Sequence, residues 1–171
     1  MRVGTFGFDF SRYAAKLAER ELAARKDMAT SVSGVKGVVG AKRRETSVED
    51  DIKKARVRWT GAVRLVLGFS EFARRFMVAE AARVVAAAAR RTPVVTGRLS
   101  KAWSIGGTHR AGFKYETDIL NSVEYASAVE YGARKRDGRW RNGRFMLANA
   151  IEEEARLCKR RFDAEFKRYS G

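Results

Sequence analysis

The sequence predicts an α+β fold in which a small antiparallel sheet packs against long helices. Long segments carry apolar residues at helical spacing, while a shorter region of the second half shows apolar residues at every second position. The chain has 171 residues, of which 45% are hydrophobic, enough to bury the core of one domain, or of one domain with an extended arm. The order helix, hairpin, short helix, long helix favours helices on one face of the sheet.

The first third predicts a helix over about 11–28, where apolar residues recur near the helical period. Residues 31–40 carry glycine at every third position from Gly34, which predicts a mobile loop, since the spacing fits neither a Walker loop nor a dinucleotide-binding fingerprint. Ser47 is a candidate cap for a short helix reaching about Arg58. The apolar run at about 62–67 then predicts a strand ended by Gly68.

A helix is expected next, capped by Ser70 and ended at Arg91 before Pro93, the only proline. A Thr-Gly turn leads into a hairpin spanning about 99–120. Leu99, Trp103 and Ile105 are expected on one face of its first strand. Phe113, Tyr115 and Ile119 alternate with charged residues in the second, as in a half-buried strand.

The hairpin is followed by two further predicted helices. Asn121 and Glu124 resemble a capping box before a short helix over 123–131, which Gly132 ends. The last helix, over about 147–169, has apolar residues at steps of three and four. We therefore divide the chain into an N-terminal arm or insertion, 1–68, and an α+β domain, 69–171.

The charge is the most unusual compositional feature. Lys and Arg number 36 against 20 Asp and Glu, which gives a net charge of +16. Such an excess favours contact with nucleic acid or with an acidic protein surface, and it opposes the packing of identical subunits. No stretch approaches the ~18 apolar residues of a membrane span. Cys158 is the only cysteine, so no disulfide framework is expected, and we expect synthesis in a reducing cytosol.

The residues that could carry chemistry are better explained by structure. His109, the only histidine, lies beside glycines at the predicted hairpin tip and is expected on the surface. Cys158 occupies an apolar position of the last helix and reads as a buried small hydrophobe. Residues 152–154 are three consecutive glutamates, which diverge around a helix and predict a solvated patch. The sequence thus predicts no catalytic residue, no metal site, no cofactor and no small-molecule substrate.

Three segments resemble signatures of the tail-completion, or neck, proteins of long-tailed bacteriophages. The first segment, 91–103, contains Pro-x-x-Thr-Gly-x-Leu, and the second, 121–132, matches Asn-x-x-x-Tyr-Ala-x-x-Val-Glu-aromatic-Gly. The third, 143–150, has Phe145-Met146 followed by Ala148 and Ala150, and is similar to the family's closing Phe-Met/Leu-x-x-Ala motif. They follow the order and spacing of that family. The residues that carry the resemblance are Pro93, Thr96, Gly97, Leu99, Trp103, Asn121, Tyr125, Ala126, Glu130, Gly132, Phe145 and Met146.

The resemblance implies a non-catalytic virion protein that forms a ring, commonly six-fold, in the phage neck. Such rings lie on or next to the tail terminator and join a finished tail to the DNA-filled head, with double-stranded DNA passing non-specifically through the lumen. The implied partners are further copies of the chain, the tail terminator and the head-proximal connector. The implied location is the neck or tail of the virion, assembled in the cytoplasm of the bacterial host, without a membrane partner.

A basic loop over 134–144 is the main candidate for contact with DNA or protein. It contains six basic residues, one acidic residue and Trp140. Cations with an aromatic ring suit phosphate pairing and base stacking, but an aromatic anchor on an acidic neighbouring ring is an equal alternative. A solvated loop is the third possibility. The candidate residues are Arg134, Lys135, Arg136, Arg139, Trp140, Arg141 and Arg144.

Glu130 falls on or beside the packed face of the short helix, where its carboxylate could pair with an arginine of the same subunit or of a neighbour. Two alternatives to the neck ring stay open. One is another ring of the same machine, the tail terminator or a connector. The other is a stand-alone basic nucleic-acid-binding protein, which the net charge of +16 would also suit.

Overall fold

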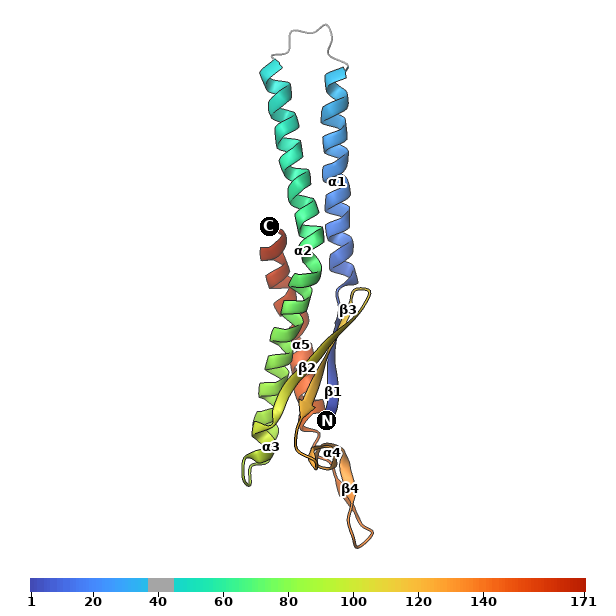
Figure 1. The fold of residues 1–171 in the computed structure, drawn as a ribbon, viewed down its shortest axis with the longest axis vertical. Coiled ribbons are helices and arrows are strands. Elements are labelled where there is room, and N and C mark those ends of the chain that lie inside the picture. Colours follow the sequence, from blue (N-terminus) through green and yellow to red (C-terminus); the bar gives the residue numbers. More distant parts are fainter. Residues whose placement is uncertain (37–44) are drawn as a thin grey trace. The chain divides into compact units, whose positions relative to one another are not determined.

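The computed structural model describes residues 1–36 and 45–171 as five helices and five strands (Figure 1). The chain divides into two compact units, one made of Met1–Asp9 and Phe72–Arg168, the other of Phe10–Glu71 and Tyr169–Gly171. The elements are β1 (Arg2–Asp9), α1 (Ser11–Lys36), α2 (Glu45–Arg91), α3 (Arg98–Lys101), β2 (Trp103–Ala111), β3 (Lys114–Asn121), α4 (Ala126–Tyr131), β4 (Gly132–Arg134), β5 (Trp140–Asn142) and α5 (Met146–Ser170).

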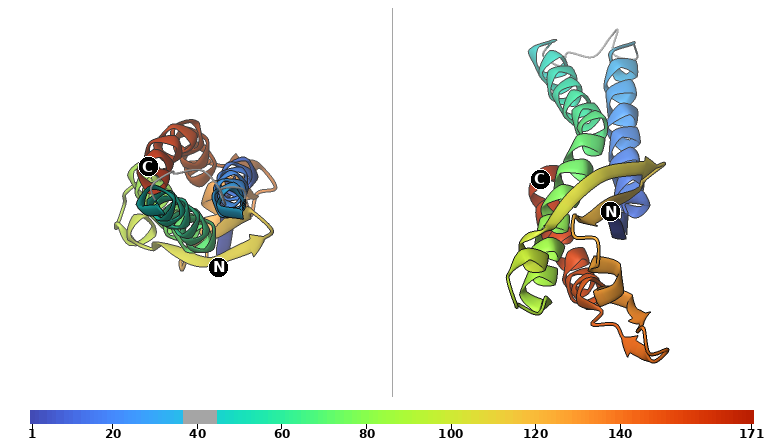
Figure 2. Two further views of the ribbon diagram at one scale, coloured as in Figure 1. Left: turned by 90° about the horizontal axis from the view of Figure 1, so that it is seen from above. Right: turned by 60° about the horizontal axis from the view of Figure 1, so that its bottom comes forward.

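The first unit contains a three-stranded antiparallel sheet in the order β1-β3-β2. Strands β2 and β3 form the predicted hairpin, which Figure 2 shows as a twisted pair. Its first strand begins at Trp103, so the placement of Leu99 on that strand is wrong, because residues 98–101 form the short helix α3. The third strand is β1, rather than the run at 62–67. On β3, Tyr115, Thr117 and Ile119 are buried and alternate with less buried residues, as a sheet with one covered face requires. The predicted α+β class, with a small antiparallel sheet and long helices, is confirmed.

Aromatic rings from β1, α2 and α5 form the core under this sheet. The Phe162 ring is fully buried, with its centroid 4.8 Å from that of Phe76 and 5.6 Å from those of Phe8 and Phe72. Edge-to-face and tilted contacts at such distances suit the quadrupoles of the rings. The sheet therefore packs against α5 and the last five turns or so of α2, as the helical spacing predicted.

An ion-pair network lies between α2 and α5 in the same unit. Glu80 is 1% exposed and accepts hydrogen bonds from Nε of Arg161, at 2.9 and 3.0 Å, and of Arg83, at 3.1 Å. The second guanidinium arm of Arg161 contacts Glu80 and also Oε2 of Glu154, at 2.8 Å. The prediction of a solvated patch at 152–154 is thus wrong for Glu154, which is 8% exposed, because Arg161, on the same face of α5 seven residues further on, compensates its burial.

The second unit contains α1, the part of α2 before Phe72, and the last three residues. Along this part of α2 the more buried positions are Ile52, Ala55, Trp59, Ala62 and Phe69, at steps of three, four and seven that are typical of a helix–helix seam. The indole Nε1–H of Trp59 donates to Glu21 of α1 over 3.2 Å. The ring of Phe69 meets Phe10 edge to face, with centroids 6.3 Å apart. These contacts pair the two helices.

The strand predicted at 62–67 is wrong, because this run is helical and belongs to α2. The seam continues through it: Ala62 and Phe69 are buried seven residues apart, whereas Leu67 is 76% exposed. Nor does Gly68 end an element. A Cβ there would lie 2.9 Å from the Tyr169 hydroxyl, which donates to the Leu65 carbonyl over 2.6 Å. A glycine is needed here for the close approach of Tyr169 to the helix, and Ser70 is no helix cap.

The loop predicted at 31–40 is also wrong for its first six residues, since α1 continues to Lys36. The hydroxyls of Thr30 and Ser31 donate to carbonyls one turn earlier, at 3.0 and 2.9 Å, so both are accommodated in a helix. The remainder of that segment, 37–40, lies outside the described residues. So does the basic run over 42–44. The helix after it begins at Glu45, two residues before the predicted cap, Ser47, and runs far past Arg58 without a break.

Trp103 lies on the buried face of the hairpin, as predicted, and is 7% exposed. Its Nε1–H donates over 2.8 Å to Oγ1 of Thr92, whose hydroxyl in turn donates to the Ala88 carbonyl. The same expectation is wrong for Phe113, which is 44% exposed. Phe113 precedes β3 in the turn, where the Arg110 guanidinium lies 6.0 Å from its ring centroid. Of these two aromatic residues, only Trp103 anchors the hairpin to the end of α2.

We expect Trp103→Ala to lower the free energy of unfolding by about 3–5 kcal/mol, because it removes a buried aromatic ring and leaves the Thr92 hydroxyl without its donor. Phe113→Ala is the matched control and should change it by less than about 1 kcal/mol, since the ring is half exposed. Urea unfolding followed by circular dichroism measures both. Equal losses for the two variants would show that Trp103 does not anchor the hairpin.

Candidate functional site

The basic segment at 134–144 is a two-stranded hairpin rather than a loop. β4 pairs antiparallel with β5, with Ala133 opposite Arg141. At the tip, the backbone N–H of Lys135 donates to the Arg139 carbonyl over 2.8 Å, and Gly138 donates back to the Lys135 carbonyl. Gly138 has a positive φ of 81°, as a tight turn allows. The prediction missed these strands because three residues each are too short to show an alternating pattern.

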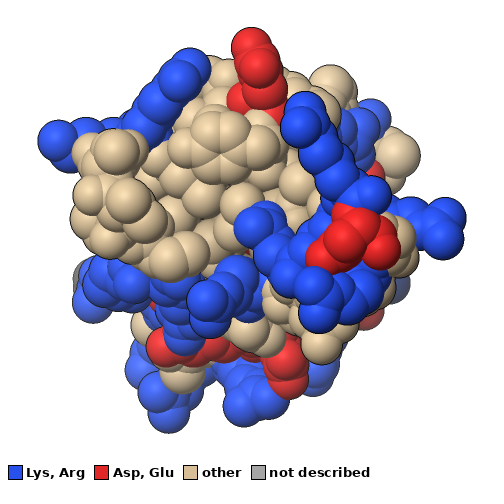
Figure 3. Space-filling view, turned by 90° about the horizontal axis from the view of Figure 1, so that it is seen from below, with Lys and Arg blue, Asp and Glu red and all other residues tan. Residues whose placement is uncertain are grey.

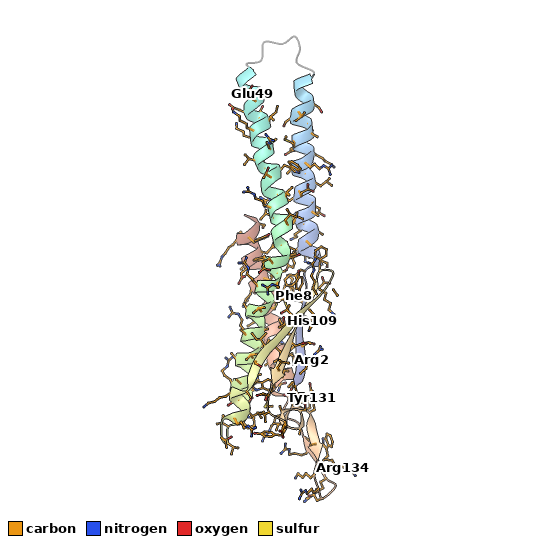
Figure 4. The ribbon with its side chains drawn as sticks, in the orientation of Figure 1. Arg2, Phe8, Glu49, His109, Tyr131 and Arg134 are labelled. Atoms are coloured by element: carbon orange, nitrogen blue, oxygen red, sulfur yellow. The ribbon has the colours of Figure 1, made fainter. Side chains whose placement is uncertain are left out.

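The basic hairpin, as we call residues 132–144, is rich in exposed cations. From Arg134 to Asn142 every residue is exposed, and Trp140 is 62% exposed. The single acidic residue, Asp137, pairs with Arg139 at 2.8 Å. Among the described residues, no acidic side chain forms an ion pair with the other five cations of the hairpin, which are Arg134, Lys135, Arg136, Arg141 and Arg144. Figure 4 labels Arg134 on this hairpin. The structure thus brings all seven predicted contact residues onto one short element.

The base of the hairpin is fixed by close backbone contacts with α4. The N–H groups of Arg144 and Phe145 donate to the carbonyls of Val129 and Glu130, at 2.8 and 3.0 Å. Gly143 allows this approach, because a Cβ there would lie 2.1 Å from the Glu130 carbonyl oxygen. A side chain at Gly143 would therefore force the hairpin away from α4.

Glu130 caps the helix that follows the hairpin. Its side chain is fully buried, and its carboxylate accepts hydrogen bonds from the backbone N–H of Leu147, at 3.0 and 3.1 Å, and of Ala148, at 3.0 Å. A carboxylate at a helix N-terminus satisfies free N–H groups and interacts favourably with the helix dipole. The expected arginine partner of Glu130 is wrong: its partners are backbone groups of the first turn of α5.

The other residues of the first two motifs hold the same region together. Asn121 is buried and donates to the Leu99 carbonyl over 3.1 Å, while its Oδ1 accepts from Val123 N–H. It therefore joins α3 to the turn before α4, and the predicted capping box with the exposed Glu124 is wrong. The hydroxyl of Tyr131 donates to the Val3 carbonyl of β1 over 2.6 Å. Burial, and then the nearby Glu130 charge, raises the pKa of Tyr131.

The remaining motif residues are partly structural and partly exposed. Leu99, Ala126 and Met146 are buried, and Gly97 forms the predicted turn, with a φ of 76°. Tyr125, in contrast, is 46% exposed. Phe145 is also 46% exposed and has a φ of 49°, a conformation that its hydrogen bond to Glu130 holds. Val94 and Val95, between Pro93 and Thr96, are 72% and 94% exposed.

His109 and Cys158 have the burial that the sequence predicted, the first on the surface and the second in the core. His109 is exposed on the open face of the sheet, and its Nε2 lies 2.9 Å from Asp118, which also pairs with Arg2 at 3.0 Å. Cys158 is buried. Burial, with the Glu80 charge second, raises the pKa of its thiol to about 12. In the part of the chain that the structure describes, no three His, Cys, Asp or Glu side chains are grouped as metal ligands.

Two features were not foreseen from sequence. The Glu130 cap was missed because the backbone N–H groups that donate to its carboxylate lie seventeen and eighteen residues further along the chain. The ion-pair network could have been suspected, since Glu80 interrupts an otherwise apolar helix face containing Phe76, Met77 and Val84. Over 1–36 and 45–171, no helix combines the length and the low charge that crossing a membrane would need.

Comparison with known families bears directly on this region. Residues 63–132 match the family model described as "Bacteriophage HK97-gp10, putative tail-component". The matched segment runs from the middle of α2 to the first residue of β4, and it includes Trp103, Asn121 and Glu130. No curated protein and no solved structure matches the chain. The resemblance to phage tail proteins is confirmed for this segment, and it indicates a structural component of a phage tail.

We expect Glu130→Ala to lower the free energy of unfolding by about 1–3 kcal/mol, because buried N–H groups of α5 lose their acceptor. Glu130→Gln keeps one acceptor oxygen and should cost less. Glu124→Ala, at an exposed site next to α4, is the control and should change stability by less than about 0.5 kcal/mol. Amide hydrogen exchange at Leu147 and Ala148 reports on the cap itself. Unchanged protection of these two amides in Glu130→Ala would contradict the capping role.

Proposed function

We propose that the chain is a subunit of a ring in the phage neck that completes the tail and joins it to the DNA-filled head. The match of residues 63–132 to a phage tail-component family carries the proposal. The Phe145-Met146 motif, outside that match, supports it, since it follows α4 at the spacing of tail-completion proteins. In this arrangement the chain is part of the virion, at its neck.

The basic hairpin is the element best suited to contact with neighbours in such a ring. It carries six cations against one carboxylate, and its aromatic side chain is 62% exposed. Two roles fit these properties: lining the lumen through which double-stranded DNA passes, or docking on an acidic neighbouring ring. We favour docking, because a rigid two-stranded element that presents a tryptophan is suited to anchor an interface. Lumen contacts need only screened, sequence-independent attraction.

Two rival functions have support of their own. The match to a tail component also fits a tail terminator or a connector, which are rings of the same machine. The net charge of +16 fits a stand-alone nucleic-acid-binding protein. Genes for portal, connector and tail-tube proteins on both sides of this gene would favour the neck subunit over the stand-alone protein.

Replacing the hairpin side chains separates the two roles of the basic hairpin. If it docks on a neighbouring ring, Trp140→Ala should yield separate full heads and tails. If it lines the lumen, neutralising Arg139, Arg141 and Arg144 together to glutamine should leave particles assembled but alter DNA retention or ejection. Electron microscopy and infectivity of both variants distinguish these results. Infectious, normal particles from Trp140→Ala would refute docking through this residue.

The free protein should be monomeric or heterogeneous and should form a defined ring only on tails. Self-repulsion at +16 opposes free association, and a partner surface of opposite charge offsets it. Light scattering of the purified protein, with and without purified tails, measures the mass of the assembly. A monodisperse ring of the free protein at low salt would contradict this dependence on a partner.

A further inference from the structure

Two hollows on the first unit lie on either side of the same pair of residues. One, of about 430 Å³, is lined by Pro93, Val129, Arg141, Asn142, Gly143 and Arg144. The other, of about 140 Å³, is lined by Pro93, Val95, Thr96, Gly97, Leu99, Tyr125 and Val129. Because Pro93 and Val129 line both, we treat them as one depression and call it the Pro93–Val129 groove. It runs between the segment after α2 and the base of the basic hairpin.

The two ends of this groove differ in chemistry. At one end Val95 is 94% exposed and Tyr125 is 46% exposed, above the buried side chain of Leu99. At the other end stand Arg141 and Arg144, both exposed. Figure 3, which looks from below Figure 1 onto the side of α3, α4 and β4, shows a broad uncharged surface beside Lys and Arg side chains. An apolar end next to a cationic end suits a segment that carries an apolar side chain beside a negatively charged one.

No acidic side chain among the lining residues competes for the two arginines. The nearest carboxylate in sequence, Asp137, is paired with Arg139 at the hairpin tip, and Glu130 is buried and engaged with α5. The cationic end is therefore free to receive a carboxylate from another molecule. An arginine can hold a carboxylate through two parallel hydrogen bonds.

From these observations we propose that the Pro93–Val129 groove binds an extended segment of a different virion protein that carries an aliphatic side chain beside one or more carboxylates. The aliphatic side chain lies against Val95, Leu99 and Tyr125, and the carboxylate pairs with Arg141 or Arg144. The identity of the partner as a virion protein rests on the proposed neck function. The chemistry of the segment rests on the groove itself.

Charge decides between the possible occupants. A second copy of this chain carries +16 and is repelled from a cationic groove, whereas a protein of opposite charge is attracted to it. The phosphates of DNA would pair with the two arginines, but they would gain nothing from contact with the apolar end. The exposed Val95 is thus the feature that separates a protein segment from nucleic acid.

The test uses particles that lack this protein: tails, and DNA-filled heads, from phage in which its gene is deleted. The purified chain is mixed with each, the particles are sedimented, and the dissociation constant is measured. Two groove variants are compared, Val95→Ser at the apolar end, and the cationic pair Arg141→Gln with Arg144→Gln. The matched controls are Val57→Ser with Leu67→Ser, which are 73% and 76% exposed on α2, and Arg160→Gln with Lys167→Gln on α5. Thermal melts equal to wild type show that every variant is folded.

We expect both groove variants to weaken binding to the same particle by about tenfold or more, and the controls to bind like wild type.

Three results would overturn the proposal, while binding of the wild-type protein to particles would still support the neck function. The first is unchanged binding by the valine variant. The second is loss of binding by the arginine variant alone, together with weaker binding to free double-stranded DNA. The third is loss of self-association by the valine variant with normal particle binding, which would assign the groove to a second copy of the chain. Wild-type protein that binds neither heads nor tails would instead refute the neck function, and the virion partner with it.

Discussion

The buried carboxylate of Glu130 is the contact on which the candidate site depends. Its side chain caps α5, while its backbone carbonyl holds Phe145 at the end of the hairpin segment. One residue thereby fixes the last turn of α4, the base of the basic hairpin and the start of α5. Tyr131, the next residue, extends the same arrangement to β1 through the Val3 carbonyl. A buried acid with all its partners in the backbone orients these elements without requiring any particular side chain opposite it.

The sequence was most informative where structure is local. The last helix was placed at 147–169 and observed at Met146–Ser170, because its apolar stripe is unbroken, and the helix end at Arg91 follows from Pro93. It was least informative where partners are distant. The glycine-rich strand β1 is held by pairing with β3, more than one hundred residues away, and has little strand propensity of its own. The false strand at 62–67 arose because six mostly apolar residues fit a strand as well as a helix. Only the helically spaced buried residues before and after them show that the run belongs to a helix.

The distribution of charge explains why so basic a chain can fold and still attract partners. Several of its acidic groups are engaged internally: Glu80 and Glu154 by Arg161, Glu130 by backbone, and Asp118 by Arg2 and His109. The carboxylates thus stabilise helix pairing, a helix terminus and the open face of the sheet. Cations without a carboxylate partner remain on the basic hairpin, because its side chains are exposed and it contains only one acidic residue. The candidate site could be found from sequence because a run of cations is visible there, whereas the uncharged groove beside it has no such signature.

The hairpin is divided into a constrained base and an independent tip. At the base, Gly143 lies against the Glu130 carbonyl and tolerates no side chain. Residues 135–139 make their hydrogen bonds among themselves, apart from the one that Nε of Arg134 donates to the Gly138 carbonyl. Exchange of these five tip residues therefore alters what the hairpin contacts while the rest of the unit keeps its fold. Fold stability and surface chemistry are thus encoded in different residues of one short element, so that the tip can be substituted without disturbing the contacts of the base.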